Sequence, residues 1–208
     1  MSEKRREETW KAHRDGDLQQ AERGYRVLLE SSAIQDDAVN LGALLRQQGR
    51  LREAAAVYEE WVPRFPHALQ LHLNAANCLH DLGRHQACAA MLRAYLQGNP
   101  PAPKARWALA RSLTELRQHA EAEALLRSLT QSHPEDLSNW LDLGLCLHRQ
   151  NKQADALACF ERVNALDPHH PVAMANRITM LKDAGRFEAC RSLVDGLSPS
   201  QREHPTVR

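Results

Sequence analysis

The sequence has almost no net charge and no long apolar run. Its 208 residues carry a formal net charge of +1, so there is neither a broad basic field for nucleic acid nor an acidic tail. The segment from Met1 to Lys11 lacks the apolar stretch of a secretory signal, and no run of about 18 residues is both apolar and uncharged. We therefore expect a soluble, cytoplasmic protein that binds neither nucleic acid nor membrane.

Paired cysteines are also missing. The five cysteines are an odd number, and none belongs to a C-x-x-C motif, so the short ligand spacing of a zinc site is absent. The chain contains a repeat of about 34 residues, described below. Cys78 and Cys146 are two such periods apart, and Cys88 and Cys190 are three periods apart. Cysteine is a small, frequently buried hydrophobe. We interpret these residues as packing positions and expect no metal or other cofactor.

Motifs of catalysis are missing as well. Among the eleven histidines there is no H-E-x-x-H pairing, and the chain holds no glycine-rich phosphate loop and no G-x-S-x-G elbow. His80 and His148 occupy the same place in different repeats, and His169 and His170 lie in an expected turn. We interpret the histidines as surface residues and expect a protein that is not an enzyme.

A regular pattern is present, and it is clearest over residues 137–168. A helix carrying Trp140 and Leu143 presents one apolar stripe, and Gly144 within that stripe allows a second helix to come close. The second helix supplies Phe160 to the contact. The segment therefore predicts two helices packed against each other.

The same residue types recur with a constant period of about 34 residues. In four successive repeats a proline follows the expected second helix and stops it. These prolines are Pro66, Pro100, Pro134 and Pro168. The small place in the second helix carries Ala54, Cys88, Ala122 and Ala156, and the large place carries Tyr58, Leu92, Leu126 and Phe160. In both period and motif the chain resembles the tetratricopeptide repeat family.

This resemblance implies an all-α fold, a right-handed superhelical solenoid of about six helix-turn-helix repeats. We expect a single array over residues 1–208, because the period passes undisturbed through every turn. In such an array each repeat touches only its neighbours. The expected repeats are residues 2–34, 35–68, 69–102, 103–136, 137–170 and 171–204.

In the family, the first helix of each repeat lines a concave groove. Carried over to this chain, the resemblance implies a peptide-binding set of Asn40, Arg46, Asn74, Asn77, His80, Trp107, Arg111, Asp142, Arg149 and Asn176. Its asparagines resemble a broken form of the asparagine ladder in O-linked N-acetylglucosamine transferase superhelices, which would grip a peptide backbone. The alternative is that asparagine is merely frequent at this place.

Trp107 and Arg111 lie one turn apart, and both residue types are enriched at binding hot spots. The alternative is that Trp107 packs inside its own repeat. A carboxylate clamp for chaperone C-termini is not expected, because Ala108 stands where a basic residue is needed beside Lys104.

The leading functional hypothesis is a non-enzymatic scaffold that binds a peptide or helix of a partner protein in its groove. The alternative is a substrate-recruiting segment of a larger enzyme, such as a glycosyltransferase, whose catalytic domain would follow Arg208. A homo-oligomer formed through the terminal repeats also stays open. RNA binding is disfavoured because the groove places mix acidic and basic residues, whereas phosphate binding requires one sign of charge.

Overall fold

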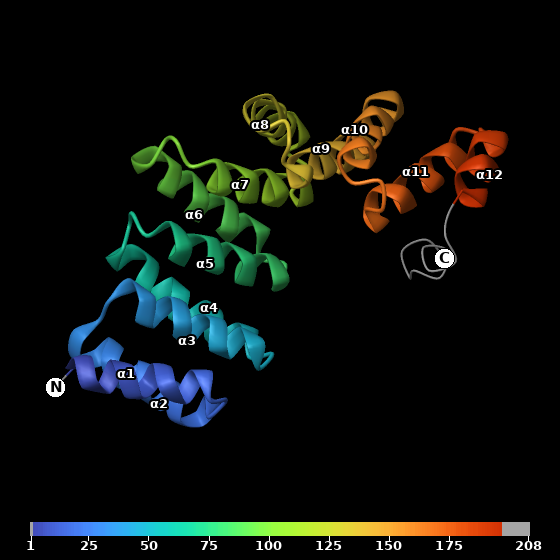
Figure 1. The fold of residues 1–208 in the computed structure, drawn as a ribbon. Helices are drawn as coiled ribbons and strands as arrows, with labels where there is room; N and C mark the ends of the chain where they lie inside the picture. Colours follow the sequence, from blue (N-terminus) through green and yellow to red (C-terminus); the bar gives the residue numbers. More distant parts are fainter. Residues whose placement is uncertain (1, 197–208) are drawn as a thin grey trace. The chain divides into compact units, whose positions relative to one another are not determined.

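The computed structural model describes residues 2–196, which form helices joined by short turns (Figure 1). No strand occurs within this described range, and the all-α fold expected from the sequence is confirmed. The helices are α1 (Ser2–Arg14), α2 (Leu18–Ser32), α3 (Gln35–Gln47), α4 (Leu51–Trp61), the 3-10 turn η1 (Val62–Arg64), α5 (Leu69–Asp81), α6 (His85–Gly98), α7 (Pro103–Glu115), α8 (His119–Ser132), α9 (Leu137–Arg149), α10 (Gln153–Leu166), α11 (Pro171–Asp183) and α12 (Phe187–Asp195).

The helices follow the repeat period of the sequence. From α3 onwards, the first helices begin one whole period apart, at Gln35, Leu69, Pro103, Leu137 and Pro171. Each is followed within a few residues by its second helix. The paired-helix repeat is therefore confirmed, while the part of the last expected repeat from residue 197 onwards lies outside the described residues.

The turn inside each pair passes through a residue with positive φ, a conformation that favours glycine because it has no Cβ. Glycine occupies most of these turns; Gly83, for example, has a φ of 67°. Arg117 and Asn151 stand at the equivalent places with φ values of 60° and 62°. The same backbone turn is thus kept in these two pairs by residues that adopt it less readily.

The chain divides into two compact units, an N-terminal unit of residues 1–116 and a C-terminal unit of residues 117–208. In the N-terminal unit, α3 packs against α5, and α5 packs against α7, while α2, α4 and α6 each pack on the first helix that follows. In the C-terminal unit, each helix from α8 to α12 packs on its neighbour along the chain. The single array over residues 1–208 stays a prediction.

Close helix packing depends on small residues at the expected places. A Cβ on Gly42 would lie 2.2 Å from Cζ of Tyr58, and a Cβ on Gly144 would lie 2.7 Å from Cε1 of Phe160. Ala156 is fully buried. All five cysteines are buried, in agreement with the packing role that their spacing predicts.

His72 corrects the interpretation of all histidines as surface residues. It is buried in α5, its Nδ1 lies 2.9 Å from the carbonyl oxygen of Ala68, and its ring centroid lies 4.4 Å from that of Tyr95. Burial lowers the pKa of His72. Its place in the repeat is that of Trp140, within the apolar stripe expected for the first helix, so position overrides the usual preference of histidine for the surface.

Candidate functional site

Seven of the ten expected binding residues lie on the first helices of the N-terminal unit. Asn40 and Arg46 belong to α3, and α5 and α7 supply the rest. Because α3 packs on α5 and α5 on α7, these three first helices lie next to one another. The residues from α5 and α7 are Asn74, Asn77, His80, Trp107 and Arg111, all of which are half-buried.

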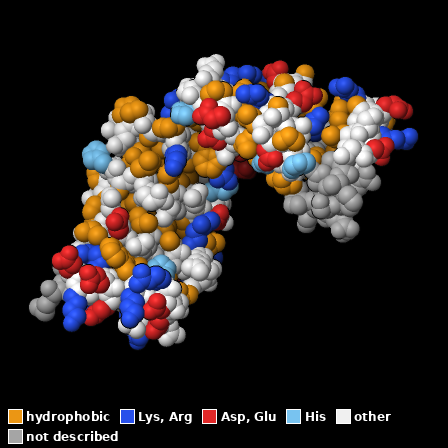
Figure 2. Space-filling view, in the orientation of Figure 1, with side chains coloured by type: hydrophobic (Ala, Val, Ile, Leu, Met, Phe, Trp, Pro, Cys, Tyr) orange, Lys and Arg blue, Asp and Glu red, His pale blue; other side chains and the backbone are white. Residues whose placement is uncertain are grey.

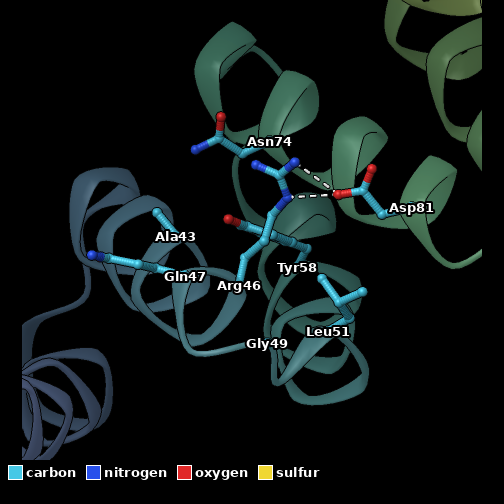
Figure 3. A pocket seen from close by; sticks show the side chains of 8 residues that line it. All are labelled: Ala43, Arg46, Gln47, Gly49, Leu51, Tyr58, Asn74 and Asp81. Atoms are coloured by element: carbon cyan, nitrogen blue, oxygen red, sulfur yellow. Dashed lines mark hydrogen bonds and ion pairs between the residues drawn. The ribbon is translucent and has the colours of Figure 1, made fainter. Parts of the chain in front are cut away.

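A cavity of about 400 Å³ opens between α3, α4 and α5 (Figure 3). Arg46, Gln47, Leu51, Tyr58, Asn74 and Asp81 contribute to its lining. Arg46 and Asn74 were expected at the site from the sequence, whereas Leu51 and Tyr58 come from a second helix. The second helix layer therefore reaches the first-helix face at this point.

An ion pair joins two successive first helices beside this cavity. Both Nε and Nη2 of Arg46 donate to Oδ2 of Asp81, at 2.8 and 2.7 Å (Figure 3). Both side chains are well exposed, and exposed pairs contribute only about 0 to 1 kcal/mol to stability. The main effect of the pair is therefore to hold the Arg46 side chain between α3 and α5 and to neutralise its charge locally.

Tyr58 reaches the cavity from α4 because Gly42 leaves room for its ring. Its side chain is buried, with 2% exposure, and its hydroxyl has no hydrogen-bond partner among the described residues. Burial raises the pKa of Tyr58, and Cys78 raises it further, while the nearby Asn74 side chain, which forms no hydrogen bond with the hydroxyl, lowers it in part. The hydroxyl therefore stays protonated at neutral pH. Figure 3 shows the hydroxyl end turned toward the space beside Asn74.

Trp107 and Arg111 form a second feature of the same face, on α7. The guanidinium carbon of Arg111 lies 4.9 Å from the ring centroid of Trp107, within the range of a cation–π contact. Nε1 of Trp107 is buried and has no partner among the described residues. The Trp107 side chain as a whole is half-buried, and the guanidinium of Arg111 covers part of its indole ring.

His80 lies near this pair and faces His85 at the start of α6. The two ring centroids are 4.9 Å apart. Burial lowers the pKa of His80, and the charges of Arg111 and His85 lower it further. No motif within a single helix contains this pair, because its members lie on either side of the turn between α5 and α6.

The other three expected residues belong to the C-terminal unit. Asp142 and Arg149 lie on α9, half-buried and exposed respectively. Asn176 lies on α11, where its Nδ2 donates to the carbonyl oxygen of Val172 at 2.9 Å. This amide is therefore engaged by its own helix, and a peptide backbone would have to compete with that bond.

Tyr58 is the main residue that the sequence analysis missed. The family resemblance directs attention to first helices, and Tyr58 lies on a second helix. The sequence does pair a large residue, Tyr58, with a glycine, Gly42. A tyrosine packed over a glycine can extend past the first helix, so its hydroxyl can reach the first-helix face.

No group of three or more histidine, cysteine or acidic side chains in residues 2–196 is arranged to hold a metal ion. None of the described helices is long and apolar enough to cross a membrane. Figure 2 shows acidic and basic side chains intermixed over α1 and α2, with no patch of a single sign on that part of the visible face.

Models of the tetratricopeptide repeat match three stretches of the chain. The matched stretches are residues 39–105, 79–144 and 137–170, which together span residues 39–170. More than half of the chain is therefore covered by one repeat type. No curated protein matches the sequence.

Solved structures with the same fold are distant in sequence. A tetratricopeptide repeat protein from Parabacteroides merdae is 17% identical with a TM-score of 0.81, over 93% of this chain and 77% of that one. MamA from Desulfovibrio magneticus is 16% identical with a TM-score of 0.71, over 81% and 96%. YrrB, a repeat protein described as having an unusual peptide-binding site, is 20% identical with a TM-score of 0.63, over 88% and 94%.

Proposed function

The chain belongs to the tetratricopeptide repeat family, and from this premise we propose that it is a non-enzymatic scaffold that binds an extended segment of a partner protein. Proteins of this family bind protein or peptide partners. The proposed binding surface is the first-helix face of α3, α5 and α7 in the N-terminal unit. The C-terminal unit is not needed for this proposal.

The observation that carries the proposal is the Trp107–Arg111 pair. Arg111 is half-buried, and its guanidinium lies over the indole of Trp107. An arginine fork binds ligand carboxylates and backbone carbonyls well. The adjacent indole adds a large apolar surface, the combination that dominates many binding interfaces.

The polar character of the rest of the face favours an extended peptide. Asn40, Asn74 and Asn77 offer side-chain amides at successive places along α3 and α5, and each amide can both donate and accept a hydrogen bond. Acidic and basic residues are mixed on this face, as the ion pair between Arg46 and Asp81 shows. This mixture suits a peptide backbone better than a polyanion.

The test uses the full chain and a displayed library of random dodecapeptides, followed by affinity measurements on enriched peptides. Arg111→Ala, alone and combined with Trp107→Ala, should weaken binding by about tenfold or more. The matched control is Arg64→Ala, because Arg64 lies 4.2 Å over Trp61 in the same kind of contact but at the end of a second helix. That control should leave the affinity unchanged.

Thermal unfolding of each variant separates lost binding from lost folding. The proposal is contradicted if no peptide is enriched. Equal affinities for the parent and the folded Arg111→Ala chain would contradict it too.

A further inference from the structure

Two tyrosines occupy the same place in the first two repeats, but only one has its hydroxyl bonded. The spacing from His13 to Tyr25 equals the spacing from Arg46 to Tyr58. The hydroxyl of Tyr25 is hydrogen-bonded to Nδ1 of His13 at 2.9 Å. In the second repeat Arg46 extends to Asp81 instead, and the hydroxyl of Tyr58 is left without a partner in the described residues.

A buried hydroxyl without a partner is costly, and it marks a place where a ligand group would be favourable. The hydroxyl oxygen itself is buried, and the Tyr58 side chain lines the cavity between α3, α4 and α5. Figure 3 shows its polar end directed into that space, next to Asn74. The cavity is large enough for one amino-acid side chain of a bound peptide.

The cavity offers both donors and acceptors. Oδ1 of Asn74 accepts from Nε2 of Gln70 at 2.9 Å, and the amide nitrogen of Asn74, which has two N–H donors, is the group left to interact with Tyr58 and a ligand. Oδ2 of Asp81 accepts both bonds from Arg46, which leaves Oδ1 available to accept. The hydroxyl of Tyr58 can do either. A matching ligand group therefore needs an acceptor and a donor close together.

The local charge decides among ligand groups. Arg46 and Asp81 neutralise each other, so a charged side chain entering the cavity would lose its hydration without meeting a net opposite charge. A carboxylate has no donor for Asp81, and an ammonium group can donate to Asp81 and Tyr58 but has no acceptor for the amide nitrogen of Asn74. A primary carboxamide has one carbonyl oxygen and two N–H donors, and it satisfies both sides without a net charge.

We propose that the cavity between α3 and α5 binds the carboxamide side chain of an asparagine or glutamine in the partner segment. Its oxygen accepts from Tyr58 and Asn74, and its nitrogen donates to Asp81. This inference rests on the proposed function, and it names the residue type that the N-terminal unit selects. The hydroxyl of Tyr58 is then the group that distinguishes an amide from an apolar side chain of the same size.

The experiment applies the dodecapeptide library to the full chain and to Tyr58→Phe. The parent chain should enrich peptides with asparagine or glutamine at one fixed position. In an enriched peptide, replacing that residue by leucine should weaken binding by about five- to tenfold, the effect of one or two hydrogen bonds. Tyr58→Phe should reduce the preference for glutamine over leucine to about threefold or less, because phenylalanine keeps the ring opposite Gly42 and removes one of the three partners of the amide.

The matched control is Tyr25→Phe, whose hydroxyl is already bonded to His13. This variant should keep the preference for the amide. Methylating the backbone nitrogen at the same peptide position distinguishes the two sources of an amide group. Loss of binding on side-chain replacement but not on methylation supports the proposal, whereas loss only on methylation assigns the cavity to the backbone and overturns it.

The remaining outcomes also decide the matter. A preference for glutamate or lysine at that position overturns the carboxamide subsite, and so does an amide preference that Tyr58→Phe leaves undiminished. If peptides bind but show no preference at any position, the scaffold function stands and the subsite falls. If no peptide binds the parent chain, both proposals fall together.

Discussion

Arg117 stands at a turn place where equivalent positions carry glycine. Its φ is 60°, whereas Gly83 and Gly185 adopt 67° and 68° at the same place in other repeats. A side chain other than glycine in this region costs about 1 kcal/mol or more. Arg117→Gly should raise the free energy of unfolding by about 0.5 to 1 kcal/mol, less than the full strain because glycine also gains entropy in the unfolded chain.

Denaturant unfolding of three variants checks this expectation. Asn151→Gly should give a smaller gain, because asparagine tolerates the left-handed region better than arginine does. Gly83→Ala should lose about 1 kcal/mol, since alanine cannot adopt that φ without strain. A loss of stability in Arg117→Gly would show that the arginine side chain makes a contact worth more than the backbone strain.

Some residues of the candidate site could be predicted from the sequence, and others could not. Arg46, Trp107 and Arg111 could be assigned to one face because a helix repeats its faces with a fixed period. Tyr58 and His85 could not, because their approach depends on how the second helix packs against Gly42 and on the turn after α5. Side-chain contacts across helices are not encoded by periodicity within one helix.

At the scale of elements, Glu123 on α8 forms hydrogen bonds with side chains of the turn before α10. Its Oε2 accepts from Nζ of Lys152 at 2.7 Å and from Nε2 of Gln150 at 2.9 Å, and its Oε1 accepts from Nε of Arg127 at 2.8 Å. Burial opposes ionisation of this carboxylate, but the three hydrogen bonds outweigh it and lower the pKa of Glu123 to about 2. The network joins α8 to the segment between α9 and α10 in the C-terminal unit.

The depressed pKa of Glu123 predicts a pH dependence of stability. An unfolded glutamate has a pKa of about 4.3, so the ionised form stabilises the fold fully above that pH. This contribution is lost as the pH falls from about 4 to the folded value of about 2. Glu123→Gln should lower the free energy of unfolding by about 1 to 3 kcal/mol at pH 7, and by much less near pH 2.

Denaturant unfolding at several pH values measures that difference, with Glu161→Gln as control because Glu161 is exposed on α10. The control should change little at any pH. A constant difference between the parent and Glu123→Gln from pH 7 to pH 2 would contradict the assignment of the stabilising network to the ionised carboxylate.

The order and pairing of the helices could be predicted because one period is repeated with the same residue types. Gly144 opposite Phe160 and the row of closing prolines ending in Pro168 fix where each pair begins and ends. The division after Leu116 has no such signal, since the period continues through it. The period specifies how two helices pair within a repeat, whereas compact units depend on contacts between repeats.

At the scale of the whole molecule, stability in a repeat protein is the sum of local terms and interfaces between neighbours. A destabilising change in one compact unit should therefore act mainly on the amides of that unit. Gly42→Ala forces a Cβ against Tyr58 in the N-terminal unit, and Gly144→Ala forces one against Phe160 in the C-terminal unit. Each change overpacks a buried contact, which costs about 1 to 3 kcal/mol.

Hydrogen exchange measured by mass spectrometry on both variants tests whether the two units respond separately. Gly42→Ala should speed exchange in α3, α4 and α5 and leave α9 and α10 at the parent rates, and Gly144→Ala should do the reverse. Adding Tyr58→Leu to Gly42→Ala should restore part of the lost protection, because the third repeat already combines Ala76 with Leu92 at these places, both buried. Equal acceleration throughout residues 2–196 in either variant would instead mean that the chain opens as one cooperative body. The binding face proposed for the N-terminal unit would then depend on packing in the C-terminal unit as well.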